Sequence, residues 1–226
     1  LSNANSGKGL MLGGITGVKP VEVVIIGAGT VGEFATRAAL GLGASVKVFS
    51  NSISKLRRLQ DGVGCRVYTS VIQPDLLEKS LKDADVVIGA VRAEEGRCPL
   101  VITEKMVTQM SEGSVIVDVS IDQGGCCETS KVTSHEKPTF VQHGVVHYCV
   151  PNIASRVART ASYALSNILA PVIIDMAESG GIDESVKKTY STRSGIYLYK
   201  GSLTNRYLAE RFKLPFKDLD LLFAAY

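Results

Sequence analysis

The segment VEVVIIGAGTVG, residues 21–32, decides the fold of this chain. Residues 21–26 form a continuous run of mostly β-branched side chains that ends at a glycine, which is typical of a strand buried on both faces. Residues 30–41 then carry apolar side chains at helical spacing. The segment therefore predicts a strand, a tight glycine turn and a helix.

Three glycines in this segment, Gly27, Gly29 and Gly32, have the spacing G-x-G-x-x-G. In a turn between strand and helix, the first glycine allows the tight bend, the second lets a pyrophosphate approach the backbone, and the third lets helix and strand pack closely. The helix start adds free N–H groups and a partial positive charge. The pattern indicates dinucleotide binding, and a glycine turn without a ligand is the alternative.

The alternation of strand and helix continues along the chain. We expect strands at 45–49, 66–69, 85–89, 114–119 and 144–150, and helices at 53–59, 74–82 and 103–110. Strands that alternate with helices form a parallel sheet with right-handed crossovers. Six such strands predict an α/β fold, a doubly wound parallel sheet of the Rossmann type that binds NAD(P).

The pattern changes after Val150. Residues 155–179 read as one long apolar helix, followed by a polar stretch at 182–192, a short strand-like segment at 196–200 and a helix at 203–212. This tail is too short to hold a core of its own. We therefore expect a dinucleotide-binding domain at 1–159 and a helical C-terminal appendage, consisting of a long linker helix and a further remnant, at 160–226.

Composition narrows the function classes. The 226 residues carry a net charge of only +3, and bases do not alternate with aromatics as they do on nucleic-acid surfaces. No apolar run approaches the roughly 20 residues of a membrane helix. The five cysteines match no metal-binding spacing and indicate reduced thiols in the cytoplasm. We expect a cytoplasmic protein without a nucleic-acid or membrane partner.

Three histidines are present, and two of them, His143 and His147, are spaced to share one face of a strand. No third ligand stands at a persuasive spacing, so we predict no metal site. Ordinary, partly buried histidines are the favoured interpretation.

The residue after the second strand is Ser50, where a dinucleotide fold usually has an acid that holds the adenosine ribose. Serine hydrogen-bonds a ribose hydroxyl more weakly, but it also removes a charge that repels a 2′-phosphate. Arg57 and Arg58 follow shortly after; either they reach such a phosphate or they are solvated charges on a helix. The residues alone leave NAD and NADP open.

Asp122 and Gln123 follow the predicted strand 114–119, just before two glycines. They lie at the carboxyl end of the sheet, where open α/β sheets bind ligands. The pattern indicates polar groups near a nicotinamide, and a simple turn cap is the alternative.

Several motifs resemble the alanine dehydrogenase family: LGGITGVKP at 12–20, ADVVIGAV at 84–91, GSVIVD at 113–118, IDQGGC at 121–126 and HYCVPN at 147–152. The α chain of proton-translocating transhydrogenase is a related family, and the Ile-Asp-Gln-Gly-Gly form favours alanine dehydrogenase. The resemblance is collinear from residue 9 to 178 and continues more loosely to Pro215.

The resemblance implies roles for individual residues. Asp122 matches the family's active-site aspartate. The positions expected to contact the cofactor are Gly27, Gly29, Gly32, Ser50, Val91, Val119, Ser120, Ile121, Asp122, Lys131, Val150, Asn152 and Ile153. Ser50 departs from the family's usual aspartate. The family's substrate-binding Arg and Lys and its catalytic His belong to an N-terminal half that this sequence does not contain.

The implied reaction converts L-alanine, NAD and water to pyruvate, ammonium and NADH in a homo-oligomer. We expect these 226 residues to bind the cofactor without useful turnover on their own. The alternatives are a transhydrogenase-type NAD(H)-binding domain and a non-catalytic nucleotide-binding or regulatory module; saccharopine-type dehydrogenation fits less closely.

Overall fold

The computed structural model describes residues 1–2, 6–93 and 96–224, which form two compact units, Leu1–Ile153 and Ala154–Tyr226. The break between them precedes the boundary expected at Arg159. All of the candidate site residues belong to the first unit.

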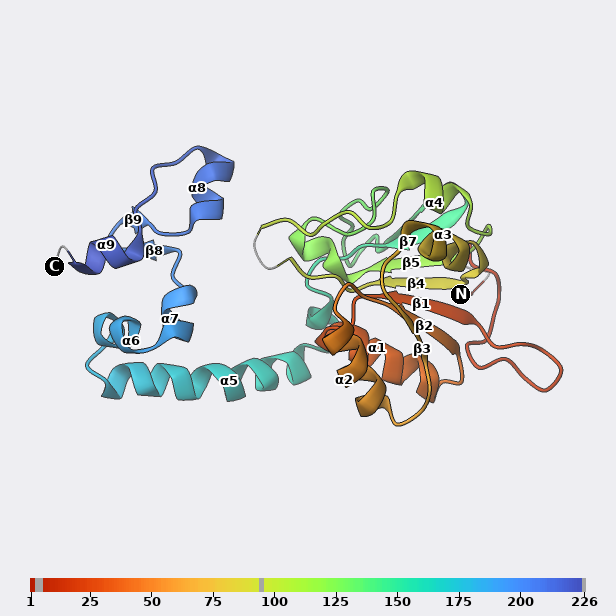
Figure 1. Ribbon diagram of the computed structural model, residues 1–226, viewed down its shortest axis with the longest axis horizontal. Helices are drawn as coiled ribbons and strands as arrows, with labels where there is room; N and C mark the ends of the chain where they lie inside the picture. The colour runs from red at the N-terminus through yellow and green to blue at the C-terminus, as the bar shows by residue number, and fades with distance from the viewer. Residues whose placement is uncertain (3–5, 94–95, 225–226) are drawn as a thin grey trace. The chain divides into compact units, whose positions relative to one another are not determined.

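The first unit is built on one seven-stranded sheet (Figure 1). Its strands are β1 (Glu22–Ile26), β2 (Ser45–Phe49), β3 (Tyr68–Ser70), β4 (Val86–Gly89), β5 (Val115–Asp118), β6 (Thr139–Gln142) and β7 (Val145–Tyr148). Their spatial order is β3-β2-β1-β4-β5-β7-β6, and every neighbouring pair is parallel except β6 and β7. The sheet grows outward from β1 in both directions, so the predicted doubly wound α/β fold is confirmed.

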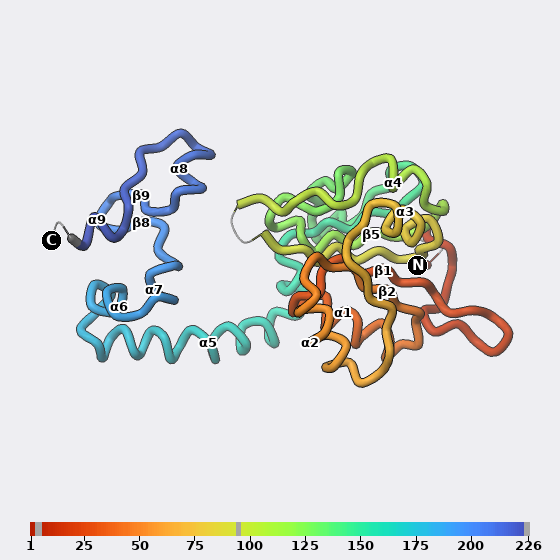
Figure 2. Tube along the Cα trace, in the orientation of Figure 1, coloured from red at the N-terminus to blue at the C-terminus, as the bar shows by residue number. Residues whose placement is uncertain are grey.

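Helices cover both faces of this sheet, as the Cα trace in Figure 2 shows. They are α1 (Thr30–Gly41), α2 (Ile53–Val63), α3 (Pro74–Asp83) and α4 (Glu104–Thr108). Successive side chains of a strand point to opposite faces. Val23 and Ile25 of β1 accordingly pack in the core under α1 and α2, while Val24 and Ile26 pack in the core under α3 and α4. Both faces of β1 are buried from Val23 to Ile26, which explains why these four residues are all apolar.

Strand β6 was not predicted, because residues 139–142 follow Pro138 in a stretch that looks irregular in sequence. The strand pairs antiparallel with β7, and His143 and Gly144 form the turn between them with φ of 54° and 75°. Two successive positive φ values suit the tight turn of a twisted hairpin. The sixth strand expected at 144–150 therefore begins after this turn, and the sheet is mixed at one edge.

The second unit is mostly helical. It contains α5 (Ala158–Glu178), which follows a 3-10 turn at Ile153–Val157, then α6 (Ile182–Lys188), α7 (Tyr190–Ser194), α8 (Arg206–Phe212) and α9 (Leu219–Ala224), with a small hairpin of β8 (Leu198–Tyr199) and β9 (Ser202–Leu203). The polar stretch at 182–192 is thus helical. The helix expected from residue 203 begins at Arg206. Among the described residues of this unit, Val186, Tyr199 and Ala209 are the buried apolar side chains.

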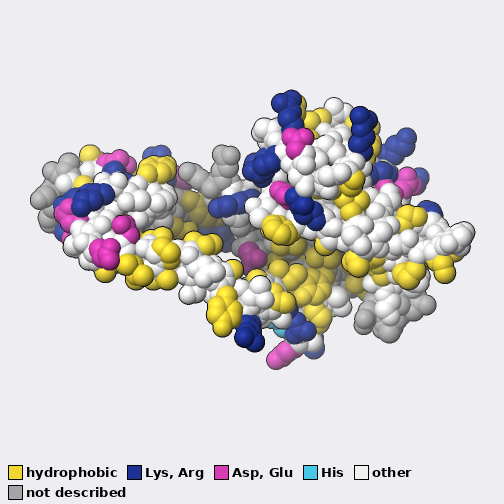
Figure 3. All heavy atoms as spheres, turned by 90° about the horizontal axis from the view of Figure 1, so that it is seen from below, with side chains coloured by type: hydrophobic (Ala, Val, Ile, Leu, Met, Phe, Trp, Pro, Cys, Tyr) yellow, Lys and Arg dark blue, Asp and Glu magenta, His cyan; other side chains and the backbone are white. Residues whose placement is uncertain are grey.

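The helical stretch Ile153–Glu178 is 26 residues long, contains an 18-residue segment with a mean hydropathy of 1.3, and is long and apolar enough to cross a membrane. This corrects the expectation that no segment meets that requirement. Several of its apolar side chains, among them Leu165, Ile168 and Ile173, are more than half exposed, and hydrophobic side chains are visible along it in Figure 3. Length and composition alone are weak evidence of a membrane span, because a core helix of a soluble protein passes the same test.

Candidate functional site

The turn after β1 needs glycine at two positions for reasons internal to the protein. Gly27 has a φ of 111°, and a Cβ there would clash with the carbonyl group of Ala90. A Cβ on Gly32 would clash with the carbonyl oxygen of Gly27. These two glycines therefore bring the start of α1 against the end of β1, as the spacing predicted.

Gly29 differs from both of its neighbours in the motif. It has an ordinary φ of −79°, and a Cβ built on it meets nothing within 4 Å. The space beside it is open at the N-terminus of α1, where the first-turn N–H groups receive no side-chain cap from the described residues. An anion placed there meets free N–H groups and the positive end of the helix dipole. The turn fits the pyrophosphate of a dinucleotide.

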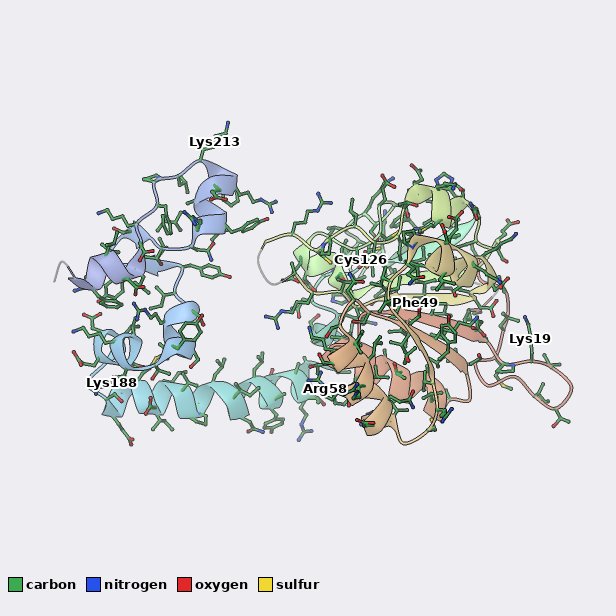
Figure 4. All side chains as sticks on the ribbon, viewed as in Figure 1. Lys19, Phe49, Arg58, Cys126, Lys188 and Lys213 are labelled. Carbon is green, nitrogen blue, oxygen red and sulfur yellow. The ribbon has the colours of Figure 1, made fainter. Side chains whose placement is uncertain are left out.

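Ser50 lies beside this turn. The Gly27 amide donates to the Phe49 carbonyl at 2.7 Å, and the Ser50 amide donates to the Ser70 carbonyl at 3.1 Å. Ser50 is 7% exposed, and its hydroxyl oxygen accepts a hydrogen bond from the Ser52 amide at 3.3 Å. Figure 4 shows Phe49 at the end of β2 and Arg58 on α2. The structure thus places Ser50 at the end of the second strand, as expected.

Asp122 lies in the 3-10 turn Val119–Gln123, which directly follows β5. Its side chain is exposed, and its Oδ1 accepts a hydrogen bond from the Asn152 amide at 2.9 Å. Asn152 has a φ of 52° and lies in the loop after β7. One hydrogen bond therefore joins the loops that leave two neighbouring parallel strands, both at the carboxyl edge of the sheet.

The loop after β4 joins the same group. The Ser120 hydroxyl donates to the Val91 carbonyl at 2.8 Å, and the Gln123 side chain accepts from the Ala93 amide at 3.2 Å. Of the predicted positions, the structure brings Val91, Ser120, Asp122 and Asn152 together through these bonds.

The remaining predicted positions differ in exposure. Ile121 and Val150 are buried, so their side chains pack in the protein, while Val119 and Ile153 are half-buried and keep some accessible surface. Lys131 is exposed, and its ammonium lies 5.9 Å from the ring centroid of Phe140 on the edge strand β6. The hydrogen bonds that join the carboxyl-edge loops do not include Lys131.

Asp118 was missed as an organising residue. It ends β5, is 1% exposed, and its carboxylate accepts hydrogen bonds from the amides of Ser120 at 3.0 Å and Cys126 at 3.0 Å and from the hydroxyl of Ser130 at 2.7 Å. The hydrogen bonds to the buried Asp118 carboxylate thus hold both ends of the loop that carries Asp122. The signal in the sequence was an aspartate at the end of an otherwise apolar strand, because acids are rarely buried unless they are hydrogen-bonded or paired.

Two of the histidines, His143 and His147, make contacts that stabilise the fold. His147 is fully buried between the Thr129 hydroxyl at 2.8 Å and the Val145 carbonyl at 2.9 Å, and burial lowers its pKa. His143 lies in the hairpin turn and pairs with Glu104 at 2.7 Å. The expectation that His143 and His147 share one face of a strand was therefore wrong. In the described ranges, no group of three or more His, Cys, Asp or Glu residues could hold a metal ion.

All five cysteines are free thiols, as the odd count suggested. Burial raises the pKa of Cys98, Cys126, Cys127 and Cys149. A thiol whose pKa is raised carries little thiolate, which is the nucleophilic form. These four side chains therefore fill the core rather than provide a nucleophile.

Comparisons with known proteins agree with this geometry. The family model "Alanine dehydrogenase/PNT, C-terminal domain" matches residues 1–206. Alanine dehydrogenase from Halomonas elongata is 44% identical over 218 residues, which cover 96% of this chain and 58% of that protein. Alanine dehydrogenase 2 from Staphylococcus aureus (strain USA300) is 41% identical over 221 residues, covering 97% of this chain and 59% of that protein. The chain thus spans less than two thirds of the length of these relatives.

Solved structures also include an alanine dehydrogenase that this chain resembles. An L-alanine dehydrogenase superposes with a TM-score of 0.85 at 38% identity, covering 94% of this chain and 58% of that chain. The transhydrogenase from Sinorhizobium meliloti superposes with a TM-score of 0.70 at 22% identity, covering 90% of this chain and 56% of that chain, which shows a shared fold alone. With its glycine turn, its carboxyl-edge loops and these relatives, the chain belongs to the alanine dehydrogenase/PNT C-terminal domain family.

Proposed function

We propose that this chain is the nicotinamide-nucleotide-binding part of an alanine dehydrogenase, which converts L-alanine and water to pyruvate and ammonium. The observation that carries the proposal is the exposed Asp122 carboxylate, which its bond to the Asn152 amide holds at the carboxyl edge of the sheet. Ligands bind at this edge in doubly wound folds. The bound cofactor would supply the hydride acceptor. NAD is the cofactor that the family implies, and Ser50 is the cofactor-contacting position at which this chain departs from the family's usual aspartate.

The residues of the chain would act by binding and positioning. Gly27, Gly29 and Gly32 would hold the pyrophosphate against the N-terminus of α1. The Asn152 amide fixes one carboxylate oxygen of Asp122, and the other oxygen accepts no hydrogen bond from the described residues. That second oxygen would accept a proton or a hydrogen bond from the amine or the attacking water. Orientation of this kind contributes substantially to catalysis.

Partners and location follow from the same proposal. L-alanine and pyruvate would be the substrate pair, and the protein would work in the cytoplasm, where free thiols persist. The exposed apolar face of α5 supports a homo-oligomer, because soluble monomers rarely leave so continuous an apolar surface open. Light scattering on the purified chain would give its mass, and a monomer at micromolar concentration would contradict this part of the proposal.

Cofactor binding is tested at Gly29. We expect Gly29→Val to weaken binding of NADH and NADPH, each measured by fluorescence titration, by at least about tenfold, because the side chain fills the space that the pyrophosphate needs. Gly41→Val, at the last residue of α1 and also facing open space, is the matched control. Equal affinities for Gly29→Val, Gly41→Val and the unaltered chain would contradict the proposal.

Turnover is tested on the unaltered chain. Because the chain spans 58–59% of the length of its relatives, we expect it to bind cofactor without oxidising L-alanine when it is alone. The measurement is NADH or NADPH formation from L-alanine at saturating cofactor. Rates like those of a full-length alanine dehydrogenase, measured in parallel, would refute this expectation.

A further inference from the structure

We propose that the turn between β2 and α2 accepts a 2′-phosphate, so that the chain binds NADP(H) at least as tightly as NAD(H), with Ser50 as the specificity-determining residue. The inference rests on the proposed function, since it concerns the adenosine end of the same cofactor. It departs from the NAD preference that the family resemblance implies.

The first step is the position of Ser50. In doubly wound dinucleotide folds, the residue that ends the second strand faces the adenosine ribose, and an acid there binds the 2′-hydroxyl. The bond from the Gly27 amide to the Phe49 carbonyl, 2.7 Å long, holds this strand end against the glycine turn. Ser50 is the next residue along the chain. The position that normally repels a 2′-phosphate therefore carries no charge in this protein.

The second step concerns hydrogen-bond donors. The Ser50 oxygen accepts from the Ser52 amide, so the proton of the Ser50 hydroxyl is available to donate. The Ser52 hydroxyl caps α2 by accepting from the Lys55 amide at 3.3 Å, and it lies 3.0 Å from the Ser54 hydroxyl. Three hydroxyls thus lie within one turn, from buried Ser50 to exposed Ser54. Hydroxyls donate to phosphate oxygens, whereas an ionised carboxylate only accepts.

The third step concerns charge. Residues 45–60 contain four bases and no acid, and the first acid that follows is Asp61. Lys47 is paired with Glu22 at 2.6 Å. Lys55, Arg57 and Arg58 are exposed, and none of them forms an ion pair within the part of the chain that the structure describes.

One acid of α1, Glu33, lies close to α2, but its charge is neutralised by a base of its own helix. Glu33 is paired with Arg37 at 3.1 Å, beside Gly62 near the end of α2. Basic side chains close to the second strand are the usual means of accommodating a 2′-phosphate. The local field therefore favours the cofactor that carries the additional negative charge.

The experiment compares NADPH and NADH affinities by fluorescence titration of the 226-residue chain and three variants. For the unaltered chain we expect an NADPH dissociation constant equal to or lower than that of NADH. Ser50→Asp should shift the affinity ratio toward NADH by about tenfold or more, since a carboxylate repels the phosphate and holds the ribose hydroxyl. Ser111→Asp, the same charge change at an exposed loop after α4, should leave the ratio unchanged.

The third variant, Arg57→Gln combined with Arg58→Gln, should weaken NADPH more than NADH, and added salt should do the same, because both reduce the attraction for a phosphate. A preference of the unaltered chain for NADH of tenfold or more, or an unchanged ratio in Ser50→Asp, would overturn the inference while leaving dinucleotide binding intact. Failure to bind either nucleotide would instead refute the proposed function, and the inference with it.

Discussion

Gly32 illustrates how a single residue fixes the approach of α1 to β1. A Cβ there would clash with the Gly27 carbonyl, and backbone cannot move as a flexible side chain can. We expect Gly32→Ala to lower the free energy of unfolding by about 1–3 kcal/mol, the usual cost of overpacking. Urea denaturation followed by circular dichroism measures this. Gly41→Ala, which meets open space in the same helix, should instead be neutral or stabilising; similar results for both variants would show that Gly32 is not tightly packed.

Asp118 contributes to stability through the hydrogen bonds that its carboxylate accepts. Its buried carboxylate accepts from several donors, and Asp118→Asn would place an N–H₂ group opposite some of those donors. We expect a loss of about 1.5–3 kcal/mol in unfolding free energy, the range for hydrogen bonds to charged groups. Asp83→Asn, at the exposed end of α3, is the control. Equal unfolding midpoints for the two variants would contradict the role assigned to Asp118.

The β6–β7 hairpin contains a group, His147, that makes the stability of the fold depend on pH. The buried His147 ring stacks on Phe140 with centroids 4.8 Å apart, and burial lowers the pKa of His147 below 6.5. The folded state therefore binds the proton less well than the unfolded state does. Stability from this group is fully present above pH 6.5 and is lost as the pH falls below that value.

We accordingly expect the free energy of unfolding to decrease between pH 6.5 and 5, and we expect His147→Gln to show a smaller decrease. His143→Asn changes the exposed histidine of the same hairpin, and asparagine tolerates its positive φ. This control should retain the pH dependence of the unaltered chain. A decrease of the same size in His147→Gln would mean that another group is responsible.

The elements also show what the sequence could reveal. The apolar run Val23–Ile26 and the glycine spacing predicted the start of the fold, because burial on both faces of a strand selects consecutive apolar residues. Strand β6 was missed, because an edge strand has one poorly covered side and its four residues follow a proline. The cofactor positions came from the resemblance rather than from periodicity. The acceptor role of Asp118 depends on the path of the following loop, which brings donors from Ser120 to Ser130 back to one carboxylate, and residue spacing alone does not predict that path.

At the scale of the whole molecule, every candidate site residue lies between Gly27 and Ile153, inside the first compact unit. We expect residues 1–153 produced alone to bind the preferred nucleotide with an affinity within about threefold of the 226-residue chain, less than 1 kcal/mol apart. Titration of both proteins measures this, and circular dichroism checks that the shorter one folds. A folded 1–153 protein that binds more than tenfold more weakly would show that the second unit contributes to the site.

The two-residue turn at His143 and Gly144 has a consequence for the order of folding. Parallel neighbours in this sheet are joined by long connections, most of which contain α-helices, so their pairing requires closure of long loops, which is entropically slow. The β6–β7 pair needs only its own turn, and isolated hairpins form within roughly 1–10 μs. Once formed, that hairpin presents β7 as a ready edge for β5, so one border of the sheet is assembled locally before the long-range pairing that completes it.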